Sequence, residues 1–359
     1  MNKRIGIIID SNHYLTDTGP LCAELKAQQF EVFLFANGDK KFKPADNPYL
    51  HKEHLLEVVH DEVVWYTDLK DLSKKLEKKQ VVAVFTQEAL PFVNQPKYFQ
   101  NRKYFIYNIV HSVDNFHPKA IAAGVIDKTI APYESYGDYL GWERKDYVPL
   151  GVPKYDVVNF LDKEKIFKKY NLPGKYILLL TPNNNLLSWF VVYRILREVK
   201  KSGYVVILKG KTPKCHKWIY RLFVDKYFLS DRSYYPFVTH ELISASDGVI
   251  GFDTTAVEEI LVFEKPLVNF SIKPYRDKAA REGNFKQFVP MWASKFCLDL
   301  NFFDYQGIKG QFKKLPEFMT HFLKKGVNYK KIQKDVFYVP GEASKRVVDY
   351  LKNELHINT

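Results

Sequence analysis

The sequence has little of what builds disulfide frameworks, metal centres or membrane spans. Its 359 residues include only three cysteines, Cys22, Cys215 and Cys297, which are too few and too scattered for a disulfide framework or a zinc cluster. No stretch approaches the roughly 18 uncharged apolar residues that a membrane-spanning helix needs. The apolar run near the N-terminus stops at Asp10, which is too short for the core of a signal peptide. We therefore expect a cytoplasmic protein in a reducing compartment.

Several nucleotide and metal motifs are also missing. No Gly-x-Gly-x-x-Gly follows the first expected strand, so the dinucleotide fingerprint is absent. The chain has no Asp-x-Asp pair of the kind that metal-dependent sugar transferases use. It also lacks zinc-finger spacing, an RNA-binding aromatic motif and a basic heptad region. We expect no metal, no resident cofactor and no nucleic-acid partner.

The charge balance is strongly basic. There are 54 lysines and arginines against 41 acidic residues, a formal net charge of +13. This excess suits phosphorylated substrates or the inner face of an anionic membrane. The alternative is a lysine-rich surface of no special role, because the lysines are spread along the chain. A hydrophobic content of 46% with 16% aromatic residues indicates folded domains rather than disorder.

Alternating strands and helices recur in two halves of similar size. In the first half a strand from Lys3 to Ile9 precedes a helix from Leu21 to Gln28, and in the second a strand spans Tyr176 to Thr181. A Gly/Pro turn at residues 151–156 separates the halves. The pattern predicts an α/β protein with two Rossmann-like doubly wound domains facing across a cleft, the layout of GT-B glycosyltransferases. The expected domains are an acceptor domain at 1–155, a nucleotide-donor domain at 156–340, and a C-terminal helix at 341–359 that packs back on the first domain.

Candidate catalytic residues follow two strands of the first half. Asp10 and His13 come after the first strand, and His111 directly follows a strand from Tyr104 to Val110. Ligands of doubly wound sheets bind at the carboxyl ends of strands, and a histidine there is suited to proton transfer. The alternatives are loop residues that hydrogen-bond their own turn and a structural histidine.

The segment from Ser246 to Phe270 predicts a phosphate site in the second half. A short apolar strand there ends at Asp253, Thr254 and Thr255, and a helical pattern follows. Backbone N–H groups and the positive end of the helix dipole would bind phosphate, and the threonine hydroxyls could donate as well. The alternative is that these residues only cap a helix.

Two further groups extend the predicted nucleotide site. Glu258 and Glu259 lie one turn into the same helix, where a carboxylate could accept from a ribose hydroxyl. Lys209 ends a strand that begins at Val205, and its ammonium could hold a diphosphate from the other side. A solvated lysine is the alternative.

Four motifs in the same order resemble the CDP-glycerol glycerophosphotransferase family and neighbouring capsular polysaccharide transferases, which are related to UDP-N-acetylglucosamine 2-epimerases. His111-Ser112 stands where that group has His-Gly-(Thr/Ser), without the glycine. Lys209 fits a Lys-x-His-Pro element whose His-Pro is missing and whose histidine would be displaced to His216. The Gly-x-Pro-(Arg/Lys)-x-Asp hinge of that group is matched in full by Gly151, Pro153, Lys154 and Asp156. Its nucleotide segment has an Asp, two hydroxyl residues and a helix, and then Lys-Pro before the next strand. That segment is matched by Asp253, Thr254, Thr255, Lys265 and Pro266.

The resemblance implies a metal-independent transferase. Its donor would be a CDP-, CMP- or UDP-linked sugar or polyol phosphate, and its acceptor a cell-surface glycan or a lipid-linked molecule. His111 would be the base, Thr254 and Thr255 would bind phosphate, and Lys209 would neutralise the leaving group. Two alternatives remain: a sugar-nucleotide epimerase of the UDP-N-acetylglucosamine 2-epimerase type, and a non-catalytic nucleotide or glycan binder.

Overall fold

The chain divides into two compact units. The first comprises Met1–Phe160, Ser233–Pro236 and Gln333–Thr359, and the second comprises Leu161–Arg232 and Phe237–Ile332. The computed structural model describes residues 3–38, 50, 52–87, 92, 94–110, 124–134, 143, 145–181, 193, 196–197, 199–201, 203–210, 222–228, 233–252, 256–271, 296–301, 327–336 and 340–356.

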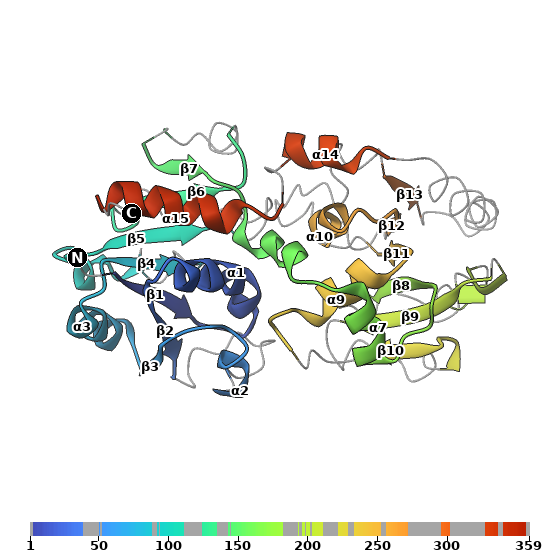
Figure 1. Ribbon diagram of the computed structural model, residues 1–359, viewed down its shortest axis with the longest axis horizontal. Coiled ribbons are helices and arrows are strands. Elements are labelled where there is room, and N and C mark those ends of the chain that lie inside the picture. Colours follow the sequence, from blue (N-terminus) through green and yellow to red (C-terminus); the bar gives the residue numbers. More distant parts are fainter. Residues whose placement is uncertain are drawn as a thin grey trace. The chain divides into compact units, whose positions relative to one another are not determined.

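The first unit contains a seven-stranded parallel sheet in the order β3-β2-β1-β4-β5-β6-β7 (Figure 1). The direction of winding reverses between β1 and β4, so the topological switch point lies there, where ligands of such sheets bind. The strands are β1 (Arg4–Ile9), β2 (Glu31–Asn37), β3 (Glu62–Tyr66), β4 (Ala83–Thr86), β5 (Phe105–Ile109), β6 (Lys128–Ala131) and β7 (Tyr147–Pro149).

Helices flank this sheet and bury both of its faces. The longest, α1 (His13–Ala27), packs against α15 (Ala343–Glu354) and against the 3-10 segment η2 (Pro153–Asn159). Other helical segments among the described residues of this unit are α2 (Lys52–Leu55), α3 (Leu69–Lys79) and η1 (Pro96–Tyr98). A strand buried on both faces requires a continuous apolar run, and β1 provides one with Ile5, Ile7, Ile8 and Ile9 all at most 1% exposed.

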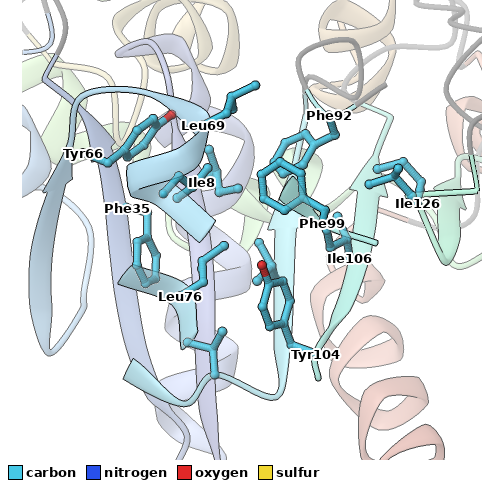
Figure 2. Packing of buried hydrophobic residues seen from close by; sticks show 14 of the residues in the cluster. Ile8, Phe35, Tyr66, Leu69, Leu76, Phe92, Phe99, Tyr104, Ile106 and Ile126 are labelled. Atoms are coloured by element: carbon cyan, nitrogen blue, oxygen red, sulfur yellow. The ribbon is translucent and has the colours of Figure 1, made fainter. Parts of the chain in front are cut away.

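A large apolar cluster fills the space between the sheet and α3 (Figure 2). Ile8 comes from β1, Phe35 comes from β2 and Leu76 comes from α3, and the rings of Phe92 and Phe99 lie in the same cluster with centroids 4.7 Å apart. Tilted aromatic pairs of this kind add to the stabilisation that burial provides. Val84 of β4 belongs to the same cluster, so β1 and β4, which pair in parallel, share this core, and their carboxyl ends form the switch point.

The start of α1 corrects one prediction. Gly19-Pro20 suggested a helix beginning at Leu21, but α1 begins at His13 and contains Pro20. The amide of His13 donates to the Ser11 hydroxyl at 3.2 Å, which satisfies a donor of the first turn. The segment around Pro20 is buried, so tertiary packing outweighs the cost of a proline inside a helix.

A short segment from the second half of the sequence belongs to the first unit. Ser233–Pro236 lies against α1 and the chain after α2. The Glu57 carboxylate accepts from the amides of Tyr234 and Tyr235 at 2.6 and 2.8 Å, and the Thr16 hydroxyl donates to the Tyr234 carbonyl at 2.8 Å. The backbone of the Ser233–Pro236 segment is therefore held by Thr16 of α1 and by Glu57. No sequence motif marks this segment.

The second unit contains a six-stranded parallel sheet in the order β10-β9-β8-β11-β12-β13 (Figure 1). Its winding reverses between β8 and β11, which places a second switch point there. The strands are β8 (Tyr176–Thr181), β9 (Val205–Gly210), β10 (Lys226–Phe228), β11 (Gly248–Gly251), β12 (Leu267–Ser271) and β13 (Cys297–Asn301). The described helices are α7 (Lys163–Tyr170), α9 (Val238–Ala245) and α10 (Val257–Val262), and α14 (Tyr329–Val336) carries the chain back into the first unit.

Two doubly wound α/β sheets confirm the predicted fold class. One local prediction for the second unit is wrong: the sequence at residues 237–238 predicts a short strand, but Val238 is the first residue of α9. The edge strands β3, β10 and β13 were not anticipated. None of the described helices is both long and apolar enough to cross a membrane.

Candidate functional site at the carboxyl edges of the two sheets

Asp10 connects three neighbouring strand ends in the first unit. It directly follows β1 and accepts from Asn37 Nδ2, at the end of β2, at 3.2 Å. It also accepts from the hydroxyl of Tyr66, the last residue of β3. Burial and the negative charge of Asp10 hold the pKa of Tyr66 well above its ordinary value, so this hydroxyl stays protonated and keeps donating. Asp10 is thus a fixed carboxylate at the predicted edge.

His13 lies at the same edge, three residues beyond Asp10. It is the first residue of α1 rather than a loop residue. Its ring meets the edge of the Tyr234 ring, with centroids 5.3 Å apart. The structure therefore places Asp10 and His13 near one strand end and connects His13 to the Ser233–Pro236 segment. Both remain predicted catalytic residues.

The other predicted chemistry falls partly outside the described residues. His111 lies beyond β5, whose following residue Val110 is the last one described there. Asp253, Thr254 and Thr255 also lie outside the described residues, between Phe252 and Ala256. The same holds for His216. Their roles stay predictions.

Lys209 occupies the carboxyl edge of the second sheet. It is only 3% exposed, and its Nζ donates to the Gly210 carbonyl at 2.6 Å. In the register between β8 and β9, Leu180 pairs with Lys209 and Thr181 pairs with Gly210. The ammonium group is therefore held by the backbone at the end of β9, one strand from the switch point.

Thr181 is a second polar residue at this edge, and no sequence motif marks it. It ends β8 and is 8% exposed, and no described residue hydrogen-bonds its Oγ1. A buried hydroxyl without a partner costs free energy, and such groups in a native structure often mark a ligand, an ion or a water. A single threonine at the end of an apolar strand was the only sequence signal.

The two glutamates of the predicted ribose site lie in the first turn of α10. Glu258 is 5% exposed, and Glu259 is partly buried. The N-cap position is Ala256, which makes no side-chain capping bond. Because α10 follows β11 and β11 pairs with β8, these carboxylates belong to the same sheet edge as Thr181. Within the described residues, no group of three metal-ligating side chains occurs.

The predicted hinge packs against the C-terminal helix of its own unit. Gly151 has a φ of +93°, and a Cβ added there would lie 2.8 Å from the Arg346 guanidinium and 3.1 Å from Ala343. Pro153 begins η2, and the buried Lys154 places its ammonium 4.8 Å from the centre of the Tyr155 ring. Gly151 is therefore required by both its backbone angle and the close approach of α15.

Asp156, the last residue of this motif, caps α15. Its carboxylate accepts from the amides of Gly341, Ala343 and Ser344 at 2.9, 3.1 and 2.5 Å. The side chain is 3% exposed. Burial raises the pKa of Asp156 above its ordinary value, although the three N–H donors favour the charged form. Within the described residues, Asp156 therefore anchors the N-terminus of α15.

Lys265 and Pro266 lie at the opposite edge of the second sheet. They precede β12, and Pro266 closely approaches Gly248 at the start of β11. Burial, together with the nearby positive charge of Lys163, lowers the pKa of Lys265 to about 8. This part of the nucleotide motif thus connects α10 to β12 at the amino edge, away from Lys209 and Thr181.

The solved structures with this fold include UDP-GlcNAc 2-epimerases and a wall teichoic acid polymerase. Neither a protein-family model nor a curated protein matches the sequence. The epimerase of Neisseria meningitidis, bound to UDP-GlcNAc, matches with 15% identity and a TM-score of 0.61, over 98% of this chain and 100% of that chain. An S. aureus MnaA structure with UDP matches with 15% identity and a TM-score of 0.63, over 99% and 98% of the two chains.

The polymerase is wall teichoic acid polymerase TagF, in a variant soaked with CDPG. It matches with 12% identity and a TM-score of 0.62, over 99% of this chain and 89% of that chain. These are the two groups that the sequence motifs resemble, so the suggested likeness is confirmed at the level of the fold. At such identities the likeness shows that the chain shares the GT-B-type fold of the UDP-GlcNAc 2-epimerases and TagF.

Proposed function

We propose that this protein is a transferase that moves a sugar or polyol phosphate from a nucleotide-activated donor to a glycan or lipid-linked acceptor. Structures that share its fold carry UDP, UDP-GlcNAc or CDPG. The donor of this chain would accordingly be CDP-, CMP- or UDP-linked. Its acceptor would bind in the first unit.

The buried ammonium of Lys209 at the carboxyl edge of the second sheet is the observation that carries this proposal. Thr181, whose hydroxyl has no hydrogen-bond partner among the described residues, ends the neighbouring strand β8 and pairs with Gly210 in the register. A preorganised cation and hydroxyl stabilise charge that develops on a departing phosphate. Thr254 and Thr255 would donate to the same phosphates, and a carboxylate of Glu258 or Glu259 would accept from the ribose.

Proton transfer would come from the first unit. His111 is proposed as the base that deprotonates the acceptor hydroxyl, with Asp10 and His13 at a neighbouring strand end. Asp10 is already held by two donors, so it would orient a neighbouring group and keep local negative charge in place. A base must lie within hydrogen-bond reach of the proton that it removes.

Nucleotide binding is expected to stabilise the wild type and to depend on the edge residues of the second sheet. A ligand at 100 times its dissociation constant adds about 2.7 kcal/mol to the free energy of unfolding. We expect such a shift with one of CDP, CMP, UDP or GDP, or with a CMP- or UDP-linked sugar. The shift should be lost in Lys209→Met and in the double variant Thr254→Ala/Thr255→Ala.

Lys175→Met is the matched control for this titration. Lys175 is exposed and precedes β8, at the amino edge of the same sheet. Its replacement should leave the ligand-induced shift unchanged. If no nucleotide stabilises the wild type, or if Lys175→Met abolishes the shift as fully as Lys209→Met, the proposed nucleotide site is wrong.

An epimerase is the second candidate, because UDP-GlcNAc 2-epimerases share the fold. Both candidates bind a nucleotide-linked sugar, so binding alone does not separate them. They differ in the fate of the donor, because a transferase releases a nucleotide as the acceptor is modified. An epimerase returns an altered sugar that is still linked to the nucleotide, with no net release of nucleotide.

A further inference from the structure

Gln87 is buried, and its side-chain amide has no hydrogen-bond partner among the described residues. It directly follows β4 and is 4% exposed. Neither its Nε2 nor its Oε1 makes a hydrogen bond to any described residue. An amide offers two donors and an acceptor with two lone pairs, and no residue in the described part of the chain uses any of these on the Gln87 side chain. Burying such a group without a partner destabilises the folded state.

The position of Gln87 coincides with the switch point of the first sheet. β4 pairs with β1 in a parallel register in which Phe85 lies opposite Ile7. The same register brings Gln87 level with Ile9, one residue before Asp10. Adjacent strands lie about 4.8 Å apart, so the amide and the Asp10 carboxylate come from neighbouring strand ends. Ligands of doubly wound sheets bind in the crevice outside these ends.

The chemistry of this edge favours a neutral hydroxylated ligand. A sugar or polyol hydroxyl both donates and accepts, which matches an amide. A phosphate or carboxylate could use only the donors of Gln87 and would leave its carbonyl oxygen without a partner. The carboxyl edge of the second sheet, by contrast, carries the buried Lys209, whose positive charge suits an anionic ligand.

We propose that Gln87 forms part of an acceptor subsite in the first unit that binds a neutral sugar or polyol hydroxyl. This inference rests on the proposed transferase function and adds the chemical class of the acceptor group. The amide is a positioning group that fixes the orientation of the ligand. It takes no part in proton transfer.

The variant Gln87→Met separates a ligand-binding role from a structural one. Methionine has a similar length and no amide, so it removes the unsatisfied group. We expect the melting temperature of the ligand-free protein to rise by about 2–4 °C. Binding of neutral probes should weaken about 10-fold, which corresponds to about 1.4 kcal/mol. A structural amide would give the opposite change in stability.

The probes are methyl β-D-glucopyranoside and glycerol, with glycerol 3-phosphate as the anionic counterpart, in ligand-observed NMR titrations of the full chain. The control variant is Thr129→Val. Thr129 lies within β6 of the same sheet, and its fully buried hydroxyl also has no described partner. The Thr129→Val variant should be at least as stable as the wild type and should bind the probes with unchanged affinity.

Several results would overturn the inference. They are a lower melting temperature of Gln87→Met, equal probe affinities of wild type and variant, and tighter binding of glycerol 3-phosphate than of both neutral probes. Absence of neutral-probe binding to the wild type would also overturn it, even where a nucleotide stabilises the protein. If Gln87→Met does not fold, Gln87→Leu replaces it, and failure of both shows a structural amide. Neutral probes that bind while no nucleotide does would contradict the proposed function instead.

Discussion

Replacing Asp156 with alanine is expected to lower the free energy of unfolding by about 4 kcal/mol, the largest loss that we predict for a single substitution. The carboxylate accepts from three backbone amides at the start of α15. Without it these donors lose their partner, and each buried unsatisfied donor costs about 1–3 kcal/mol. The helix that they begin packs on α1, so its loosening also exposes apolar surface.

Asp162→Ala is the matched control. Asp162 is an exposed N-cap whose carboxylate accepts from the amides of Glu164 and Lys165 at 2.9 and 3.2 Å. Water can replace it there, so the expected loss is about 1 kcal/mol, as for ordinary helix caps. Urea unfolding with a common slope measures both variants. Equal losses for Asp156→Ala and Asp162→Ala would show that the burial of Asp156 adds nothing.

Replacing Gly19 with alanine is expected to destabilise the first unit by about 2 kcal/mol. Gly19 lies inside α1, where helix propensity alone favours alanine by about 1 kcal/mol. A Cβ at this position would, however, lie 2.3–2.7 Å from three atoms of the Tyr235 ring. That overlap costs more than the propensity gains, so the net change is a loss. The Ser233–Pro236 segment would have to move away from α1.

A double variant tests this steric reason directly. In Gly19→Ala/Tyr235→Ala the overlap between the new Cβ and the Tyr235 ring is absent. The stability that the double variant loses should therefore be smaller than the sum of the losses of the two single variants. Gly174→Ala is the control, because a Cβ at Gly174 meets no atom within 4 Å and the residue is exposed. It should change the stability by less than about 0.5 kcal/mol. Additive losses in the double variant would mean that Gly19 and Tyr235 act independently.

The central strands could be predicted from the sequence, and so could the edge strand β7, because residues 146–150 predict a short strand there, but the edge strands β3, β10 and β13 could not. The runs that form β1 and β8 are continuous and apolar because the strands are buried on both faces. By contrast, β10 is three residues long and has no buried residue, so it shows neither a run nor an alternation. The start of α1 was missed because Gly19-Pro20 is a strong local break signal, and only burial against distant segments offsets it.

The sequence predicts which residues of the candidate site lie at strand ends, but it does not predict which side chains contact one another. Strand ends are visible in sequence, so Asp10 and Lys209 could be placed at carboxyl edges in advance. The partners of a side chain come from segments far along the chain, as with Asp156 and Ser344. Whether Gln87 or Thr181 has a hydrogen-bond partner is likewise a tertiary property. No local motif marks either residue.

The most direct test of the transferase proposal is the nucleotide released from CDP-, CMP- and UDP-linked donors, measured with and without a lipid-linked or glycan acceptor. We expect nucleotide release that requires the acceptor and equals the amount of acceptor modified. We also expect that Lys209→Met abolishes this release while Lys175→Met leaves it unchanged. A donor converted to its epimer without acceptor and without net release of nucleotide would contradict the account, and so would a donor that binds and is never consumed.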